Sequence, residues 1–379
     1  MGTTLVDQLL HWSSTAPDSV AFRWLRDDGS EEAILSFAAL ETQTSIVSSR
    51  LMNEWLVGKG ERALLVYLPG LAFISAFLGC LRAGVVAVPI YPPDPAHPEK
   101  GLDKMDAHAR CAKPAVALTE KRLSAALRGA WVQHQTDVPS TQQPFAWYET
   151  DDASDDAVRS LFCGPLLIDE EALAFIQFTS GSTGTPKGVS VTHKQLRANL
   201  TAMGDVLASP SRDAGGLRFC CWLPQYHDLG LIGNIAFSIV EGASCTLMSP
   251  ASFVKRPVRW LEAISYYSAT HIFAPNFAFE LCARKVRDEQ LGRLDLSCVM
   301  SAVNGAEPLR PSTMHRFLER FGPCGFRLDA YSPGYGCAEN VLVISVSLPN
   351  QPALEIHVAR ESLTRGCFIQ LAVPSKSKR

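Results

Sequence analysis

Residues 172–192 read ALAFIQFTSGSTGTPKGVSVT, a pattern that predicts two strands joined by a loop rich in glycine and hydroxyl groups. The residues that follow, 194–203, have helical character. Glycines let backbone N–H groups approach phosphate oxygens, and a lysine adds a positive charge. We therefore interpret the segment as a polyphosphate-binding loop. Its candidate ligand-binding residues are Thr179, Ser180, Gly181, Ser182, Thr183, Gly184 and Lys187.

Two other interpretations of this loop are weaker. A polar hairpin tip seldom needs four hydroxyl groups, two glycines and a lysine together. A Walker A loop requires a Ser or Thr directly after its lysine and opens a helix. Here Gly188 follows Lys187, and a Thr-Pro pair separates Gly184 from the lysine. We therefore set aside the nucleoside triphosphatases of the Walker type.

An α/β fold with largely parallel sheets is predicted by the alternation of strand-like and helical runs on both sides of the loop. Residues 61–120 have the pattern of a βαβ unit. The uncharged run 63–81 is long enough to cross a membrane, but Pro69 and Gly70 interrupt it, so we interpret it as a strand, a turn and a helix. The expected parts are a first α/β subdomain at 1–170, a second with the phosphate loop at 171–348, and a partial third subdomain with a frayed tail at 349–379.

The composition is that of an ordinary globular protein. Hydrophobic residues make up 47% and charged residues 19% of the 379, which excludes a mainly disordered chain, a collagen and a coiled coil. The net charge of −3 gives no reason to expect a nucleic-acid partner. The 11 cysteines form no Cys-x-x-Cys pair and the N-terminus does not look like a secretory leader, so we expect reduced thiols and a cytoplasmic location. The aspartates at 151, 152, 155 and 156 are interpreted as a solvated loop rather than a metal site.

The phosphate loop and three later segments together resemble the adenylate-forming superfamily, the AMP-forming acyl ligases. The loop matches that family's signature, and residues 222–233, 304–308 and 335–339 resemble its further motifs. Within the superfamily the chain is most similar to the fatty acyl-AMP ligases. The segments that carry this narrower resemblance are 224–233, 248–253, 256–261, 269–277 and 321–326.

This resemblance implies the large N-terminal domain of the acyl-adenylate-forming fold, with mostly parallel sheets flanked by helices and with the acyl and adenine pocket in the subdomain at 171–348. It also implies activation of a fatty acid with ATP and Mg²⁺, and transfer of the acyl group to an acyl carrier protein. Two alternatives stay open. The chain could bind a nucleotide, an acyl chain or a partner without catalysis, or it could be an acyl-CoA ligase.

Individual residues receive roles through the same resemblance. The adenine would be contacted by Asn304, Gly305 and Ala306, and the purine would stack on Tyr335 beside Gly336. Glu339 would supply an oxygen ligand for Mg²⁺. The predicted catalytic residues are Lys187, His227 and Glu339, with His227 orienting the carboxylate or screening charge.

A structural role is the alternative for most of these residues. Tyr335 could be a core residue, Glu339 a helix cap or ion-pair partner, and Asn304 with Gly305 a plain turn. His227 could simply be packed and bonded to Asp228. The apolar run 273–279 could line an acyl tunnel or belong to the core, and we expect a structural role for His271.

The family pattern also continues past Arg379. It includes an aspartate for the ribose hydroxyls, a hinge and a C-terminal lid with a further lysine, and none of these is recognisable in the sequence. We therefore expect the lid domain to be absent from this chain and its turnover to be impaired, because the lid supplies a charged contact in the transition state.

Overall fold

The computed structural model describes residues 4–137, 145–151, 167–179, 186–208 and 216–371. Several residues singled out above lie outside these ranges. They are the loop residues Ser180, Gly181, Ser182, Thr183 and Gly184 and the aspartates Asp152, Asp155 and Asp156.

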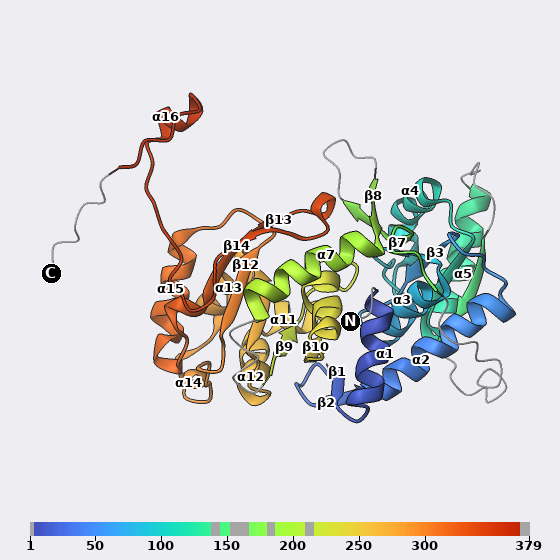
Figure 1. Ribbon diagram of the computed structural model, residues 1–379, viewed down its shortest axis with the longest axis horizontal. Coiled ribbons are helices and arrows are strands. Elements are labelled where there is room, and N and C mark those ends of the chain that lie inside the picture. The colour runs from blue at the N-terminus through green and yellow to red at the C-terminus, as the bar shows by residue number, and fades with distance from the viewer. Residues whose placement is uncertain (1–3, 138–144, 152–166, 180–185, 209–215, 372–379) are drawn as a thin grey trace.

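Two sheets make up the framework, and helices pack on both (Figure 1). The six-stranded sheet has the order β6 (Ala146–Glu149), β5 (Val116–Thr119), β3 (Arg62–Val66), β4 (Val86–Pro89), β7 (Leu173–Thr179) and β8 (Lys187–Thr192). The eight-stranded sheet has the order β14 (Val343–Val346), β13 (Tyr331–Gly336), β12 (Ser301–Gly305), β11 (His271–Pro275), β9 (Arg218–Cys221), β10 (Ser244–Met248), β1 (Val20–Leu25) and β2 (Glu31–Ser36).

Most neighbouring strands are parallel. Among the described strands, the antiparallel pairs are β1–β2, β7–β8 and β13–β14, each at the edge of a sheet. The α-helices are α1 (Leu5–Thr15), α2 (Phe37–Ser49), α3 (Leu71–Ala83), α4 (Leu102–Ala112), α5 (Lys121–Asp137), α7 (His193–Met203), α9 (Asp228–Gly230), α10 (Phe237–Val240), α11 (Pro250–Lys255), α12 (Val258–Tyr266), α13 (Asn276–Lys285), α14 (Asp288–Leu291), α15 (Pro311–Phe321) and α16 (Arg360–Thr364). The predicted α/β class with mostly parallel sheets is confirmed.

The sheets exchange strands across the boundary that the sequence suggested at residue 170. Strands β1 and β2 belong to the eight-stranded sheet, although they lie in the first 36 residues. Strands β7 and β8 belong to the six-stranded sheet, although they follow residue 170. A division at residue 170 therefore does not separate the two sheets, because parallel pairing with β10 and β4 decides where these strands lie.

The segment 63–81 forms strand β3 and helix α3, as the sequence predicted, and β4 completes a βαβ unit after it. Strand β3 is buried along most of its length, and α3 ends at Gly84, whose φ of +69° is a left-handed conformation that favours glycine. Leu64 and Val66 face α4 and α5, whereas Ala63 and Leu65 face the main core that joins both sheets. In the described part of the chain, no helix combines the length and the apolar character needed to cross a bilayer.

Candidate functional site

The phosphate loop connects two strands that are paired up to its ends. In the antiparallel register of β7 and β8, Thr179 lies opposite Lys187 and Phe178 opposite Gly188. A Cβ atom on Gly188 would lie 2.7 Å from Ile176 Cγ2, so this position requires glycine. The predicted strands on both sides of the loop and the helix after them are confirmed in β7, β8 and α7.

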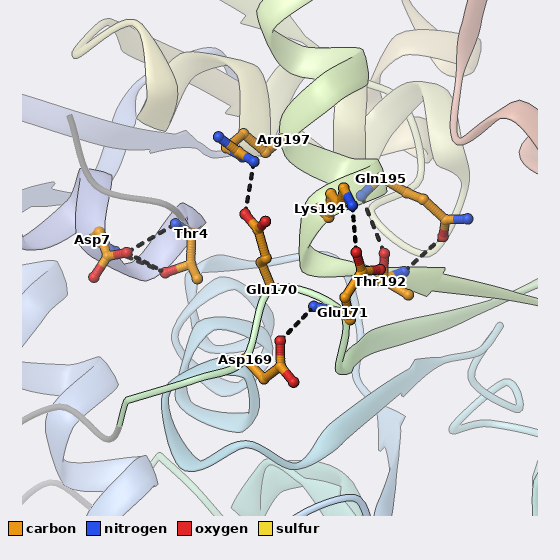
Figure 2. Close-up of polar contacts among 9 residues, drawn as sticks. All are labelled: Thr4, Asp7, Asp169, Glu170, Glu171, Thr192, Lys194, Gln195 and Arg197. Atoms are coloured by element: carbon orange, nitrogen blue, oxygen red, sulfur yellow. Dashed lines mark hydrogen bonds and ion pairs between the residues drawn. The ribbon is translucent and has the colours of Figure 1, made fainter.

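The junction between β8 and α7 is fixed by polar contacts (Figure 2). Thr192 and Gln195 form a reciprocal capping box at the start of α7. Lys194 forms an ion pair with Glu171, and Arg197 forms one with Glu170 at 2.7 Å. The two ion pairs hold the N-terminus of α7 against the residues just before β7. The start of β7 and the end of β8 are therefore fixed next to each other; we call β7, β8 and the loop between them the phosphate hairpin.

A cavity of about 650 Å³ opens beside this hairpin. It lies at the carboxyl ends of β4 and β7, the edge of a parallel sheet where ligands usually bind. Its wall brings together residues from both ends of the phosphate loop, from the 224–230 turn and from the segment after β13. The lining residues are Pro89, Ile90, Tyr91, Asp103, Lys104, Ala107, His108, Gln177, Phe178, Thr179, Pro186, Tyr226, His227, Asp228 and Ala338.

The 224–230 turn presents His227 to the cavity. Its Nδ1 lies 2.6 Å from Asp228 Oδ1, and about half of the imidazole side chain is exposed. The hydrogen bond to Asp228 raises the pKa of His227, although partial burial acts in the opposite direction. A Cβ on Gly230 would lie 2.2 Å from the Pro224 carbonyl oxygen, so the turn depends on glycine. His227 therefore has the predicted bond to Asp228 and also faces the cavity.

The segment after β13 carries Tyr335 and Glu339. Tyr335 is 67% exposed and is therefore not a core tyrosine. Glu339 lies in the short helix η7 (Ala338–Asn340) and is also exposed, next to Ala338 in the cavity wall. No ion pair or hydrogen bond of the Glu339 carboxylate is present among the described residues. These two side chains are free to meet a ligand.

Helix α7 holds this segment in place. The Asn199 side chain donates to the carbonyl oxygens of Asn340 and Val343 and accepts from the Val343 N–H. Figure 1 shows α7 running from the base of β8 toward β13 and β14. The helix that follows the phosphate hairpin therefore also positions the loop that bears Glu339.

The Asn304 side chain lies in the core, whereas the sequence suggested an adenine contact or a plain turn. It is fully buried in β12, and its amide nitrogen donates to the Tyr331 hydroxyl at 2.6 Å and lies 3.3 Å from Asn276 Oδ1. The amide nitrogen is therefore paired within the core, whereas the amide oxygen has no hydrogen-bond partner among the described residues, and the contact with adenine stays a prediction. The following residues differ, because Gly305 ends the strand and Ala306 is exposed with a φ of +66°. Such strain in a non-glycine residue often marks a functional site.

The run 273–279 divides between core and surface. Phe273 and Phe279 are fully buried in the main core, whereas Phe277 is 43% exposed and packs against Trp222. Among the described residues, none of this run lines the cavity beside the hairpin. His271 has the expected structural role. It bonds Thr270 and the Leu207 carbonyl, and burial lowers its pKa to about 4.

Sequence reasoning missed the residues that surround the hairpin from other elements. Lys104 and His108 come from α4, and Gln177 precedes the loop on β7. The Gln177 amide nitrogen donates to the Tyr226 carbonyl at 2.7 Å, and the Tyr226 ring packs edge-on against Tyr91. The only sequence signal for α4 was its helical periodicity, which shows which face is buried but not that the other face meets the phosphate hairpin.

The described residues define an α/β protein with a cavity at the carboxyl ends of parallel strands, beside the hairpin that was predicted to bind phosphates. The chain belongs to the AMP-binding enzyme family, whose sequence profile matches residues 9–362. This confirms the resemblance to the adenylate-forming superfamily.

Individual relatives within this family include ligases named for fatty acids. The chain is 35% identical over 376 residues to the medium-chain-fatty-acid–[acyl-carrier-protein] ligase JamA of Moorena producens, covering 99% of this chain and 62% of the relative. It is 34% identical to the long-chain-fatty-acid–AMP ligase FadD23 of Mycobacterium tuberculosis, covering 89% of this chain and 56% of the relative. The chain thus spans about 60% of the length of these relatives.

Solved structures agree. The fatty acyl-adenylate ligase from L. pneumophila, in complex with acyl adenylate and pyrophosphate, superposes with a TM-score of 0.83 at 33% identity, over 95% of this chain and 60% of that one. The similarity to fatty acyl-AMP ligases that the sequence suggested is therefore confirmed at the level of both sequence and fold.

Proposed function

We propose that this chain is the nucleotide- and acid-binding part of a fatty acyl-AMP ligase. The observation that carries the proposal is the cavity wall, in which Thr179 and Pro186 from the two ends of the phosphate loop meet His227 and Ala338. A nucleotide with its phosphates at the loop would have Tyr335 and Glu339 nearby. The similarity to ligases that act on fatty acids supports a fatty acid as the second substrate.

The proposed reaction is an in-line displacement at the α-phosphorus of ATP. A carboxylate oxygen of the fatty acid forms a bond to that phosphorus, the bond from phosphorus to the β-phosphate oxygen breaks, and pyrophosphate leaves. No proton needs to move. Catalysis would then rest on positioning and on neutralisation of phosphate charge.

The residues present fit these demands. Lys187 would balance charge on the phosphates, and His227, held by Asp228, would screen the repulsion between the two approaching anions. In the predicted adenine-facing segment, Ala306 is exposed directly after the buried Gly305 and would present its backbone to the base. The free carboxylate of Glu339 is a suitable oxygen donor for Mg²⁺, which would supply further charge neutralisation when bound.

The acceptor of the acyl group is the finer part of the proposal. One similar ligase is named for transfer to an acyl carrier protein, and we propose the same class of acceptor here. A cytoplasmic location stays a prediction from the cysteine pattern.

The test is nucleotide binding by the 379-residue chain, measured by calorimetry with ATP and MgCl₂. We expect Lys187→Ala to weaken ATP binding by about tenfold or more, the loss of one charge-assisted contact. Lys285→Ala is the control, because this exposed lysine lies in the last turn of α13, away from the hairpin. Equal ATP affinity in the wild type and Lys187→Ala would contradict the phosphate-loop assignment.

Adenylate formation separates the proposed enzyme from a binding protein. Trapping of the acyl-adenylate by hydroxylamine, with a fatty acid and ATP, should yield hydroxamate that depends on both substrates, at a rate well below the roughly ten per second typical of enzymes. ATP binding without any hydroxamate would instead favour a non-catalytic, nucleotide-binding role.

A further inference from the structure

Helix α4 presents a lysine to the cavity beside the phosphate hairpin. Residues Asp103, Lys104, Ala107 and His108 lie along one side of the helix, and all four line the cavity. The opposite side of the helix is anchored, because Leu102, Met105 and Ala109 are buried against the six-stranded sheet. The position of Lys104 is therefore set by the fold.

The same helix contacts the hairpin. Helix α4 packs against β8, which begins at Lys187. The His108 ring lies edge-on to the Phe178 ring with 4.5 Å between centroids, and Phe178 is the residue before Thr179. Lys104 thus belongs to the wall that also contains Thr179 and Pro186, the described residues at the two ends of the phosphate loop.

Among the described residues, the two carboxylates in this wall lie next to histidines. Asp228 is bonded to His227, and Asp103 lies 3.9 Å from His134 Nε2. No ion pair of Lys104 is present in the part of the chain that the structure describes. The neighbouring His108 cannot compensate the charge of Lys104, because an imidazole is neutral or positive; burial lowers the pKa of His108 and favours its neutral form. The cavity therefore offers an uncompensated cation to an anion that enters it.

We propose that Lys104 is a second cationic contact for the polyphosphate of the bound nucleotide, and for the pyrophosphate that the reaction releases. The inference rests on the proposed function and deepens it. ATP bound with one Mg²⁺ retains net negative charge, which Lys187 alone would leave partly unbalanced. A flexible lysine on an anchored helix supplies the further charge without a rigid geometric demand.

The experiment compares ligands that do and do not carry the terminal phosphates. Calorimetry with MgCl₂ would measure binding of ATP, AMP and inorganic pyrophosphate to the wild type, Lys104→Ala and Lys104→Arg. We expect Lys104→Ala to weaken ATP and pyrophosphate binding by about tenfold, as for one charge-assisted contact, and to leave AMP binding nearly unchanged. Lys104→Arg should restore most of the affinity, because it keeps the charge.

Lys100→Ala is the matched control. Lys100 lies in the short helix η2 (Pro98–Gly101) just before α4, is exposed and does not line this cavity. Thermal unfolding would check that each variant is folded. Equal losses for ATP and AMP, or no loss in Lys104→Ala while the wild type binds ATP, would overturn the role of Lys104 and leave the proposed function intact. A wild-type chain that binds neither ATP nor pyrophosphate would instead overturn both.

Discussion

At the scale of single residues, the pair of His227 and Asp228 combines a structural bond with a place in the cavity wall. The hydrogen bond from the imidazole to the carboxylate raises the pKa of His227. A positive charge at this point attracts two anions that would otherwise repel each other. The two interpretations that the sequence left open, a packed histidine and a substrate-facing one, are therefore not exclusive.

The pair makes a prediction about pH. Because the folded pKa of His227 is above its unfolded value, the stabilisation is fully present below about pH 6.5 and is lost as pH rises through the folded value. Asp228→Asn should lower the pKa of His227 and remove this part of the pH dependence of stability. Titration of the histidine side-chain resonances by NMR measures the shift.

The control for this titration is Asp329→Asn. Asp329 is an acidic residue paired with Arg327 at another site. A His227 pKa that stays the same in Asp228→Asn and in the wild type would show that the bond to Asp228 does not control its protonation.

Other residues differ in how far their environment could be predicted from the sequence. The loop was predictable because its residue types have few other uses in such a combination. The environment of Asn304 was not predictable, because an asparagine at the end of a strand suits a ligand contact and a buried hydrogen bond equally well. Only the position of Tyr331 on the neighbouring strand β13 decides for the buried bond.

At the scale of elements, the bend after β13 depends on Gly336. A Cβ atom there would lie 1.8 Å from the Leu342 carbonyl oxygen, and this carbonyl accepts a hydrogen bond from the Cys337 N–H. The register between β13 and β14 shifts at the same place. The glycine therefore fixes the bend between Tyr335 and Glu339.

We expect Gly336→Ala to destabilise the protein by about 1–3 kcal/mol, as overpacking against backbone usually does. It should also weaken ATP binding, because Tyr335 and Glu339 lie on the two sides of the bend. The measurements are urea unfolding and calorimetry with ATP.

Gly129→Ala serves as the comparison. Gly129 is exposed in α5, and a Cβ there meets nothing within 4 Å. This substitution should stabilise the helix by about 0.5–1 kcal/mol. Stability of Gly336→Ala equal to the wild type would show that the bend does not need glycine.

At the scale of the whole molecule, the sequence did not predict that β1 and β2 pair with later strands or that β7 and β8 pair with earlier ones. Local patterns predicted the βαβ unit at 61–120 and the phosphate hairpin, because each depends on residues close together in the chain. The pairing of β1 with β10 joins residues more than 200 positions apart, and no local pattern specifies it. The position of α4 beside the hairpin was hidden for the same reason.

The exchange also predicts how the molecule unfolds. The main hydrophobic core contains residues of both sheets, for example Phe22 of β1, Leu65 of β3 and Phe273 of β11. Neither sheet can lose its packing without exposing apolar surface of the other, and exposure of that surface is the main cost of partial unfolding. The described core should therefore unfold in one transition, although chains of this size often show intermediates.

Hydrogen exchange measured by mass spectrometry at increasing urea tests this expectation, because it follows peptides of each sheet separately. Peptides from β3 and β12 lie in different sheets and should lose protection at the same urea concentration. A peptide from α16 is the internal comparison, because this helix has no buried residue and should exchange first. Separate midpoints for β3 and β12 would mean that the sheets are independent units and that their common core contributes little to cohesion. In that case the site would lie between two bodies that can move apart, and the cavity beside the hairpin would not be a fixed feature of the fold.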